Sequence, residues 1–437
     1  MAISLRLVFV TWRGCRVGEI GYHYWHMKRM VWVMFVFGCD GKSSGLPEEP
    51  PERSGQWYAT DLHVHSAAGS NDADPSSTVA AHAEVAKSRG LSLIAITDHS
   101  NSAGSMDCET GDVEDCPNQG PEFPSRAEAD AVSDASISVV VGVEVSPVAS
   151  LETTMVPTGH VGCLPRPGDP FSDVTSGIVD RPVGDVLGGD GVVWCNENGG
   201  LSVINHPYAP TAWVAYDWTD MNYDAVEVFN GSARFDPGDA QAVRSWACDV
   251  AQGKGTAPVG GSDTHRADTE SPPPGILDQA LGFPTTWVWA ESGDVESVLS
   301  ALVAGQTVVS DPRTQLDVLA WNEGGVAGPG ASLNFSELGA VVRVQAEVEH
   351  SGLILQVVDL KDGSCTRDTR SEDGSTPVLD LNVLFEKHLA PNESIETEFI
   401  IEELEQHRIA AWILPVAESY LAHDGVAIAA PIELLPQ

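Results

Sequence analysis

Asp61-Leu62-His63-Val64-His65 is the stretch that decides the fold of this chain, because it ends an apolar run with the pattern of a β-strand. Side chains at positions i and i+2 of a strand leave the same face, so His63 and His65 can ligate one ion together. A lone histidine in a core is usually structural, but three further clusters follow apolar runs in the same way. They are Thr97-Asp98-His99, Asn205-His206-Pro207 and Ser262-Asp263-Thr264-His265. Histidine with carboxylate is a ligand set of zinc, iron and manganese, so the pattern predicts a multinuclear metal site.

Strands and helices alternate outward from this stretch. Strand patterns cover residues 59–65, 91–97, 137–145, 201–205, 225–229 and 257–261, and helix patterns cover 78–89, 127–135, 237–251 and 295–304. This rhythm predicts an α/β fold in which helices wrap parallel strands, and ligands at the ends of strands favour a barrel. An open doubly wound sheet is the alternative, but no Gly-x-Gly-x-x-Gly turn follows the first strand.

The pattern of residues changes after Pro312, where helical patterns become rare. Antiparallel strands are expected at 340–348, 353–358, 377–383, 396–401 and 408–414, which predicts a β-sandwich-like domain over residues 313–437. Its scattered histidines are expected on the surface: His350, His388, His407 and His423.

The N-terminal residues resemble a bacterial lipoprotein signal peptide. A basic pair after Met27, a short apolar stretch and Gly38-Cys39 follow one another. We expect translation to start at Met27, which makes residues 1–39 a mis-annotated start plus a signal peptide and places a lipid anchor on Cys39. A plain secretory signal or an ordinary N-terminal anchor is the alternative. Residues 40–56 are then a flexible tether, and the protein is expected in the cell envelope, on the periplasmic or extracellular face.

Charge and cysteine content narrow the partners. A net charge of −40 predicts that the surface repels phosphate backbones, so no nucleic-acid partner is expected. Excluding Cys15 and Cys39, six cysteines remain, which in an exported protein suggests disulfides. The pair Cys108 and Cys116, which flanks one acidic loop, is the expected bridge.

The ordered motifs resemble the PHP (polymerase and histidinol phosphatase) superfamily over residues 57–312. Four phrases are similar to its carbaryl-hydrolase-like branch, the CehA/McbA metallohydrolases. They are Gly159-His160-Val161, Glu227-Val228-Phe229-Asn230-Gly231, Ser262-Asp263-Thr264-His265-Arg266 and Gly282-Phe283-Pro284-Thr285-Thr286. The resemblance implies a distorted TIM-like (βα)7 PHP barrel over residues 57–312, followed by the β-sandwich-like domain.

The resemblance also implies how ligands divide between ions. The first ion is expected to be held by His63, His65, Glu144 and Asp263. Glu144 would bridge to a second ion, held by His160 and His206. A third would use His99 and His265 with an acid after His65, where only Asp72 or Asp74 is available. The cofactors are therefore two or three divalent ions, with zinc favoured and manganese or iron as alternatives.

Two further residues are catalytic candidates. Asp98 could fix the tautomer of a ligating histidine, or cap a strand end. Arg266 could hold an anionic substrate group, or pair with one of the many acids. His82 is expected to be structural or exposed, whereas Tyr208 and Asn230 could line the pocket.

These features predict a metal-dependent hydrolase that activates water against an ester-type bond of a small molecule. The superfamily resemblance implies a phosphoester, and the closer branch implies a carboxylic or carbamate ester. Because Arg266 and Arg234 are the only basic residues near the motifs, the charge balance leans slightly away from a highly charged phosphate. The alternative is a non-catalytic surface lipoprotein that binds metal or ligand.

Overall fold

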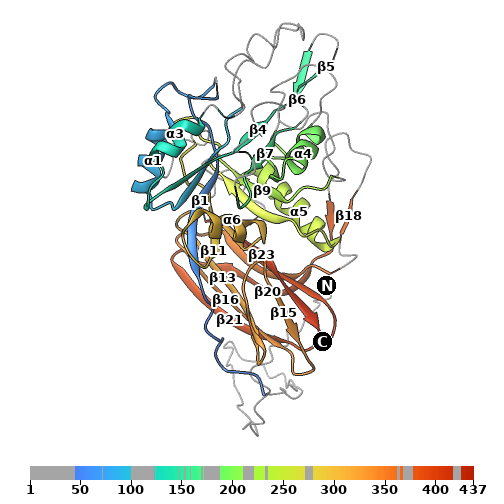
Figure 1. Cartoon of the computed structure of the whole chain (residues 1–437). Helices are drawn as coiled ribbons and strands as arrows, with labels where there is room; N and C mark the ends of the chain where they lie inside the picture. Colours follow the sequence, from blue (N-terminus) through green and yellow to red (C-terminus); the bar gives the residue numbers. More distant parts are fainter. Residues whose placement is uncertain are drawn as a thin grey trace, which may run out of the picture.

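The structure is a computed structural model of the whole chain (Figure 1). It describes residues 45–70, 72–99, 123, 125–146, 148–151, 154–157, 159–168, 171, 188–209, 221–231, 235–270, 279–361, 365–367, 377–416 and 425–437. The predicted anchor at Cys39 and the predicted Cys108–Cys116 bridge fall outside these residues and stay predictions. None of the helices that the structure describes is long and apolar enough to cross a bilayer.

The first three strands of the chain's α/β part form a parallel unit. Strand β1 (Gln56–Val64) pairs with β2 (Leu93–Ile96), which pairs with β3 (Ser138–Val141). Helix α1 (Val79–Ser88) connects β1 to β2 and begins where the Thr78 side chain accepts a hydrogen bond from the amide of Ala81. Helix α3 (Arg126–Val132) precedes β3. The βα rhythm of the sequence is therefore confirmed in this unit.

Gly142 divides the long strand predicted over residues 137–145 into two. A Cβ atom on Gly142 would lie 2.4 Å from the backbone oxygen of Cys163, so only glycine allows this close approach. After it, β4 (Val143–Val145) enters a second sheet. The strand order there is β10-β9-β8-β7-β4, with β7 (Val161–Leu164), β8 (Leu201–Ile204), β9 (Ala225–Asn230) and β10 (Ala257–Gly261).

The two sheets also meet beside β10, where Val64 at the end of β1 makes a parallel bridge to Thr264 beyond β10. Strand β7 runs antiparallel to both β4 and β8, whereas β8, β9 and β10 are parallel. Helices α4 (Gly188–Glu197) and α5 (Pro237–Ala251) accompany this sheet. The class is thus mixed α/β with many strands and few helices, and the seven-fold (βα)7 barrel stays a prediction.

The C-terminal strands continue the first sheet. Strand β11 (Thr285–Ala290) pairs with β1, β12 (Thr307–Ser310) pairs with β11, and β23 (Ala427–Pro436) pairs with β12, and each of these pairings is antiparallel. Helix α6 (Val295–Val303) separates β11 from β12. Strands β22 (His407–Pro415), β17 (Leu353–Asp359) and β20 (Asn382–Leu389) extend this sheet, and β15 (Ser332–Phe335) pairs with β23. Hydrogen bonding therefore runs without a break across the predicted boundary at residue 312.

A separate four-stranded sheet packs against the C-terminal strands of the ten-stranded sheet. Its order is β14-β13-β16-β21, with β14 (Gly325–Ala327), β13 (Gln315–Asn322), β16 (Ala340–Val348) and β21 (Glu393–Ile401). Figure 1 shows α1, α3, α4 and α5 in the upper half of the view, α6 near the middle and these strands in the lower half. Two short hairpins complete the strands: β5 (Val148–Leu151) with β6 (Thr154–Pro157), and β18 (Cys365–Arg367) with β19 (Pro377–Leu379).

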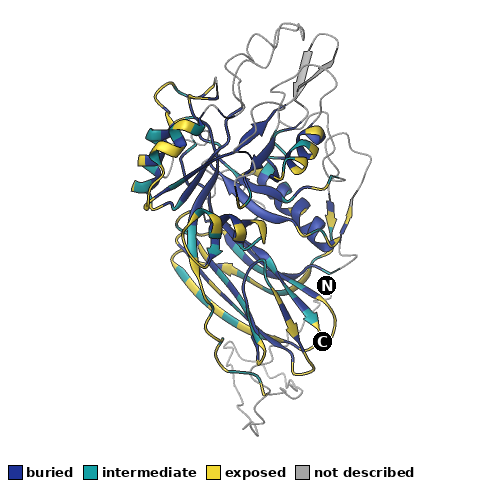
Figure 2. Cartoon of the chain, in the orientation of Figure 1, coloured by how far each residue is buried: buried dark blue, intermediate teal, exposed yellow. Residues whose placement is uncertain are grey.

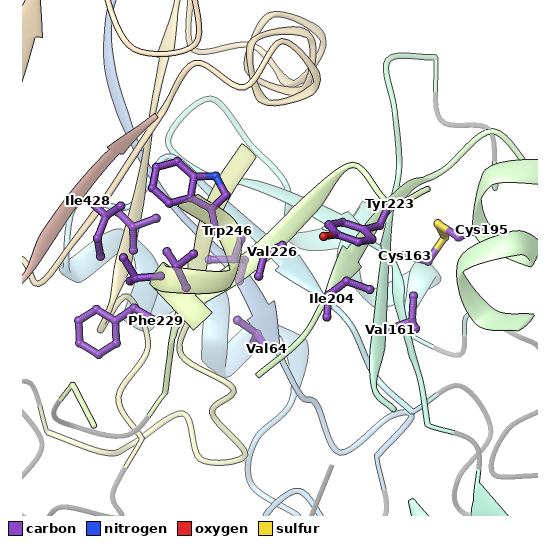
Figure 3. Packing of buried hydrophobic residues seen from close by; sticks show 14 of the residues in the cluster. Val64, Val161, Cys163, Cys195, Ile204, Tyr223, Val226, Phe229, Trp246 and Ile428 are labelled. Atoms are coloured by element: carbon purple, nitrogen blue, oxygen red, sulfur yellow. A yellow bond between two sulfur atoms is a disulfide. The ribbon is translucent and has the colours of Figure 1, made fainter. Parts of the chain in front are cut away.

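Buried and exposed residues are distributed according to these layers of strands and helices. The inner faces of the strands are buried and the outer faces of the helices are exposed (Figure 2). Phe229 and Trp246 pack in the core of the α/β part, close to Ile428 of the C-terminal strand β23 (Figure 3). Disulfides join Cys163 to Cys195 and Cys248 to Cys365, and the second bridge ties α5 to β18. The expectation of disulfides is therefore supported, by pairs that spacing could not identify.

The predicted tether contacts the strands over its described part, residues 45–56. The indole nitrogen of Trp321 donates to the backbone oxygen of Pro47 (3.0 Å), and Arg343 pairs with Glu49 (3.0 Å). These residues therefore lie along the C-terminal strands before the chain enters β1.

Candidate metal centre

Strand ends at one edge of the α/β sheets carry the predicted metal ligands. His63 lies in β1 and His65 directly after it, while His99, His206 and Asp263 follow the ends of β2, β8 and β10. His160 precedes β7. Because β7 is antiparallel to its neighbours, its beginning lies at the edge where theirs end. Strand direction therefore brings all of these side chains to one place.

The backbone at this edge departs from ordinary conformations. His206 (φ 28°) and Asp263 (φ 51°) are non-glycine residues in the left-handed region, which costs energy and is typical of functional sites. Gly261 is required for close approach, because a Cβ atom there would lie 2.3 Å from the Cβ of His63 and 2.9 Å from a Glu227 oxygen. The fold thus holds these side chains closer than a regular strand edge would.

Glu144 is the centre of the cluster and is almost fully buried. Nitrogens of five histidines lie 3.1–3.5 Å from its two carboxylate oxygens. They belong to His63, His65, His99, His160 and His206. A single carboxylate cannot accept well-aligned hydrogen bonds from so many donors, and its two oxygens are suited to bridging cations.

Asp263 completes the first predicted ligand set. One of its oxygens lies 3.1 Å from Nε2 of His65 and 3.3 Å from Nε2 of His63, and these two nitrogens are 3.0 Å apart. Nδ1 of His160 is buried, lies 3.2 Å from Glu144 and lacks the alignment of a hydrogen bond. Nitrogens and oxygens that converge in this way fit a divalent cation between them.

Of the five groups of three side chains in the described residues that place one ligand atom each within 4.8 Å of the others, four lie at this site. They are His63–His65–Glu144, His63–His206–Asp263, Glu144–His160–His206 and His65–His99–His265. These groups cover every predicted ligand except Asp72. Several of them could hold metal ions, and the shared residues make the groups neighbours.

Asp72, rather than Asp74, is the acid that lies beside the third group. Its carboxylate is 3.4 Å from Nε2 of His265 and 3.8 Å from Nε2 of His99. The Asp74 side chain accepts from the amide and hydroxyl of Ser76 instead. The distances therefore favour Asp72 over Asp74 as the acid of the third group, a choice that the sequence left open.

Electrostatics show how strongly these groups interact. Burial alone would raise the pKa of Glu144, but His160 and His63 lower it well below its ordinary value. Burial lowers the pKa of His63, yet Asp263 and Glu144 raise it well above the usual range. For His65, burial and neighbouring histidines lower the pKa to about 4. The surrounding histidines therefore stabilise the Glu144 carboxylate as an anion.

Glu227 is a site residue that the sequence reasoning left without a role. Its Oε1 accepts from Nδ1 of His63 (3.1 Å), and its Oε2 accepts from the amide of His206 and the side chain of Asn230, both at 2.8 Å. A carboxylate only accepts, so when His63 ligates a metal as a neutral ring, Glu227 would hold the ring proton at Nδ1 and leave Nε2 as the ligand atom. A charged residue inside the apolar run of β9 was the available signal.

Asp98, which could fix a histidine tautomer or cap a strand end, bonds to two serines beside the cluster. It accepts from the amide (2.5 Å) and hydroxyl (2.7 Å) of Ser66 and from the hydroxyl of Ser70 (3.1 Å). The Ser70 oxygen lies 3.0 Å from Nδ1 of His65. Because Ser70 donates to Asp98, it accepts from His65, which leaves Nε2 of His65 as the ligand atom. Burial raises the pKa of Asp98 to about 6, although the bonds from Ser66 lower it.

Ser70→Ala is expected to weaken metal binding about 10–100-fold, because the variant releases His65 from the tautomer that ligation needs. The measurement is competition for zinc or manganese with a chelator of known affinity. Ser76→Ala, in the exposed turn beside Asp74, is the matched control and should bind as the wild type does. Wild-type affinity in Ser70→Ala would show that the serine does not orient His65.

The remaining candidates have different surroundings, and of them Asn230 borders the cluster through Glu227 and Asp263. Arg266 is exposed and its Nε lies 3.5 Å from Asp268, the alternative pairing considered for it. Tyr208 bonds to Ser245, whereas Asn230 also reaches Asp263 at 3.5 Å. Arg234 falls outside the described residues. His82 is buried and contacts the backbone oxygen of His65 (3.0 Å), so it is structural.

His407 is buried in the C-terminal strands, which corrects its expected place on the surface. Its Nδ1 lies 2.7 Å from Asp359 and its Nε2 lies 2.9 Å from the backbone oxygen of Glu403. Both ring nitrogens have partners, so His407 has no nitrogen left to ligate a metal ion together with the nearby Glu403 and Glu405. This histidine fastens β22 to β17.

Fold and cluster together define the class: a mixed α/β protein with several histidine, glutamate and aspartate groups that could hold metal ions. No known family matches the sequence, and no curated protein is significantly similar to it. Solved structures give matches of low identity. One is a two-domain protein containing a predicted PHP-like metal-dependent phosphoesterase from Bacteroides vulgatus, with 14% identity, TM-score 0.38 and coverage of 88% of this chain and 97% of that one.

Two other matches are endonucleases. The lesion-specific endonuclease from Pyrococcus furiosus is 18% identical, with TM-score 0.38 and coverage of 60% of this chain and 62% of its own. Endonuclease Q in complex with a 27-mer duplex is 16% identical, with TM-score 0.35 and 56% of each chain covered. With TM-scores below 0.5, these likenesses do not assign the chain to a family.

The expected exclusion of nucleic acid as a partner is corrected: it rested on net charge alone, and one of the matched proteins, Endonuclease Q, holds a DNA duplex with an abasic lesion at its active site. The physical reason is that net charge describes the whole surface. Bound cations can dominate the local field of a site on an acidic protein, and phosphate binds there. Nucleic acid is therefore not ruled out by a net charge of −40.

Proposed function

We propose that this protein is a metal-dependent hydrolase of the PHP type that cleaves an ester-type bond. The observation that carries the proposal is Glu144, buried among five histidines with Asp263 beside them. Such a site has no need of a nucleophilic side chain. Divalent ions, when bound, supply Lewis acidity and water activated near neutral pH. Zinc suits this imidazole-rich set, with manganese or iron as alternatives.

The chain's own residues have separable tasks in this proposal. Glu144, Asp263, His63 and His65 would hold the first ion, and Glu144 with His160 and His206 would hold the second. His99, His265 and Asp72 would hold a third. Glu227 and the Ser70–Asp98 pair fix the rings of His63 and His65, so that their Nε2 atoms stay unprotonated toward Glu144.

Two classes of ester remain as substrates: a phosphoester, or a carboxylic or carbamate ester. Arg266 is exposed and its guanidinium lies beside Asp268, which offsets part of its charge. A phosphoester would therefore depend on the ions for its charge. This arrangement suits a diester or an uncharged ester better than a dianionic monoester.

Metal analysis and a hydrolase panel test the proposal. We expect two or three divalent ions per chain and turnover of a nitrophenyl phosphodiester or of a carboxylic or carbamate aryl ester. A duplex DNA with an abasic site belongs in the same panel. His63→Ala and Asp263→Ala should each lower the rate at least about a thousandfold, since each removes a ligand and leaves its partners unpaired.

Circular dichroism of both variants shows whether the fold is retained. Metal present at wild-type stoichiometry with no turnover on any substrate class would contradict the hydrolase. That result would favour a non-catalytic protein that binds metal or ligand.

A further inference from the structure

Ser146 directly follows strand β4, two positions after Glu144, and is almost fully buried. The side chains of Ser146 and Glu144 both reach His99, as expected for positions i and i+2 of a strand. Val145 between them packs in the hydrophobic core instead. The serine therefore belongs to the wall of the metal centre.

The contacts of Ser146 decide which nitrogen of His99 carries the ring proton. The Oγ atom of Ser146 is 2.9 Å from Nδ1 of His99 and 3.5 Å from the backbone oxygen of Glu144. A backbone oxygen only accepts, so the hydroxyl donates to Glu144 and accepts from Nδ1 of His99. When His99 ligates a metal as a neutral ring, Ser146 thus holds the ring proton at Nδ1 and leaves Nε2 as the ligand atom.

Nε2 of His99 faces the third group of ligands. Two ligand atoms that lie about 2.1 Å from a tetrahedral ion are about 3.4 Å apart. Nε2 of His99 is 3.8 Å from the Asp72 carboxylate, and Nε2 of His265 is 3.4 Å from it. Nδ1 of His265 lies 2.9 Å from the backbone oxygen of Asp263, which holds the proton of that ring in the same way. Both rings can therefore present Nε2 to an ion beside Asp72.

His99 has a second possible arrangement, which Ser146 opposes. Nδ1 of His99 is also 3.3 Å from a Glu144 oxygen, a spacing that would admit an ion between them. A ring with its proton on Nε2 could ligate there, and the third group would lose one of its ligands. The hydrogen bond from Nδ1 to Ser146 disfavours that tautomer. It also leaves the Glu144 oxygen to the ions of the first two groups.

We propose that Ser146 is a positioning residue that assigns His99 to the third ion, so that the centre holds three ions rather than two. This inference rests on the metal centre of the proposed function. It concerns the number of ions, however, and is the same whichever bond the protein cleaves.

Counting ions tests this role. The whole chain is titrated with zinc against a chelator of known affinity, and the absorption of cobalt follows each position as it fills. The wild type should bind three ions. Ser146→Ala should bind the third ion about 10–100-fold more weakly and hold the other two as before. Ser202→Ala, at a buried serine of β8 that bonds to Asn196 and Asp224, is the matched control and should match the wild type.

The hydroxyl itself is tested by a pair of variants with the same shape. Ser146→Thr keeps a hydroxyl and should restore most of the affinity for the third ion, whereas Ser146→Val should not. Because these two side chains differ only in the hydroxyl, they decide the question even if Ser146→Ala misfolds. Circular dichroism shows whether each variant is folded.

A double variant separates positioning of His99 from a general structural role. In a His99→Ala background the third position is already lost, so adding Ser146→Ala should weaken the remaining ions no further. Three results would overturn the proposal: two ions in the wild type, wild-type affinity for the third ion in folded Ser146→Ala, and further loss of ions in the double variant. Three bound ions without turnover would contradict the hydrolase and support the role of Ser146.

Discussion

Glu144→Gln is expected to remove at least one metal ion per chain and to lower hydrolysis at least about a thousandfold. The substitution keeps the volume but replaces one oxygen by an NH2 group. The Glu144 Oε1 atom now accepts from the amide of Asn205 (2.9 Å) and faces Nε2 of His206 (3.1 Å). In the variant, an NH2 group would meet either the Asn205 donor or the ligating nitrogens. The charge that draws cations into the buried site would be gone in both cases.

Metal content and turnover of the variant are measured together, because the two quantities decide whether Glu144 is a shared metal ligand or has no part in the site. Loss of metal and turnover in parallel supports Glu144 as a shared ligand. Wild-type metal content with wild-type turnover would show that the carboxylate has no part in the site. Glu84→Gln, on the exposed face of α1, is the matched control and should change neither quantity.

Much of the metal centre was predictable because strand periodicity is a strong local signal. Asp61, His63 and His65 alternate with apolar residues, so one face of β1 was known before its neighbours were. The same reasoning brought His99, His206 and the Asp263–His265 pair to strand ends. The side chains that orient these ligands were not predictable in the same way. Ser70 follows His65 by five residues but reaches it through an irregular turn, and Glu227 reaches His63 from 164 positions away, so strand periodicity contains neither contact.

The parts of the fold that escaped prediction depend on long-range pairing. Strand β7 (Val161–Leu164) is short, and its antiparallel direction is fixed by β4 and β8 rather than by its own residues. The break at Gly142 follows from the approach of Cys163, which is distant in sequence. The continuous sheet from β3 to β20 likewise needs β11, β12 and β23, which lacked clear patterns. Local propensity cannot specify which strands become neighbours.

Asp61 begins the stretch that decides the fold, and its role is structural rather than catalytic. It is fully buried, and its carboxylate accepts from three backbone amides: His63 (3.3 Å), Ser262 (2.9 Å) and Gly282 (2.6 Å). These amides belong to β1, to the segment after β10 and to the turn before β11. One carboxylate therefore fastens three segments behind the metal centre. Burial raises the pKa of Asp61, whereas the hydrogen bonds from Ser262 and Gly282 lower it.

Asp61→Ala is expected to lower the free energy of unfolding by about 4 kcal/mol, because it leaves buried amides without an acceptor at about 1–3 kcal/mol each. Asp61→Asn should lose about half as much, since one side-chain oxygen remains to accept. Urea unfolding of oxidised, metal-free protein measures this effect apart from metal binding. Asp74→Ala, at a surface turn, should leave the unfolding midpoint unchanged. Equal midpoints for wild type and Asp61→Ala would mean that the three segments are held together by packing alone.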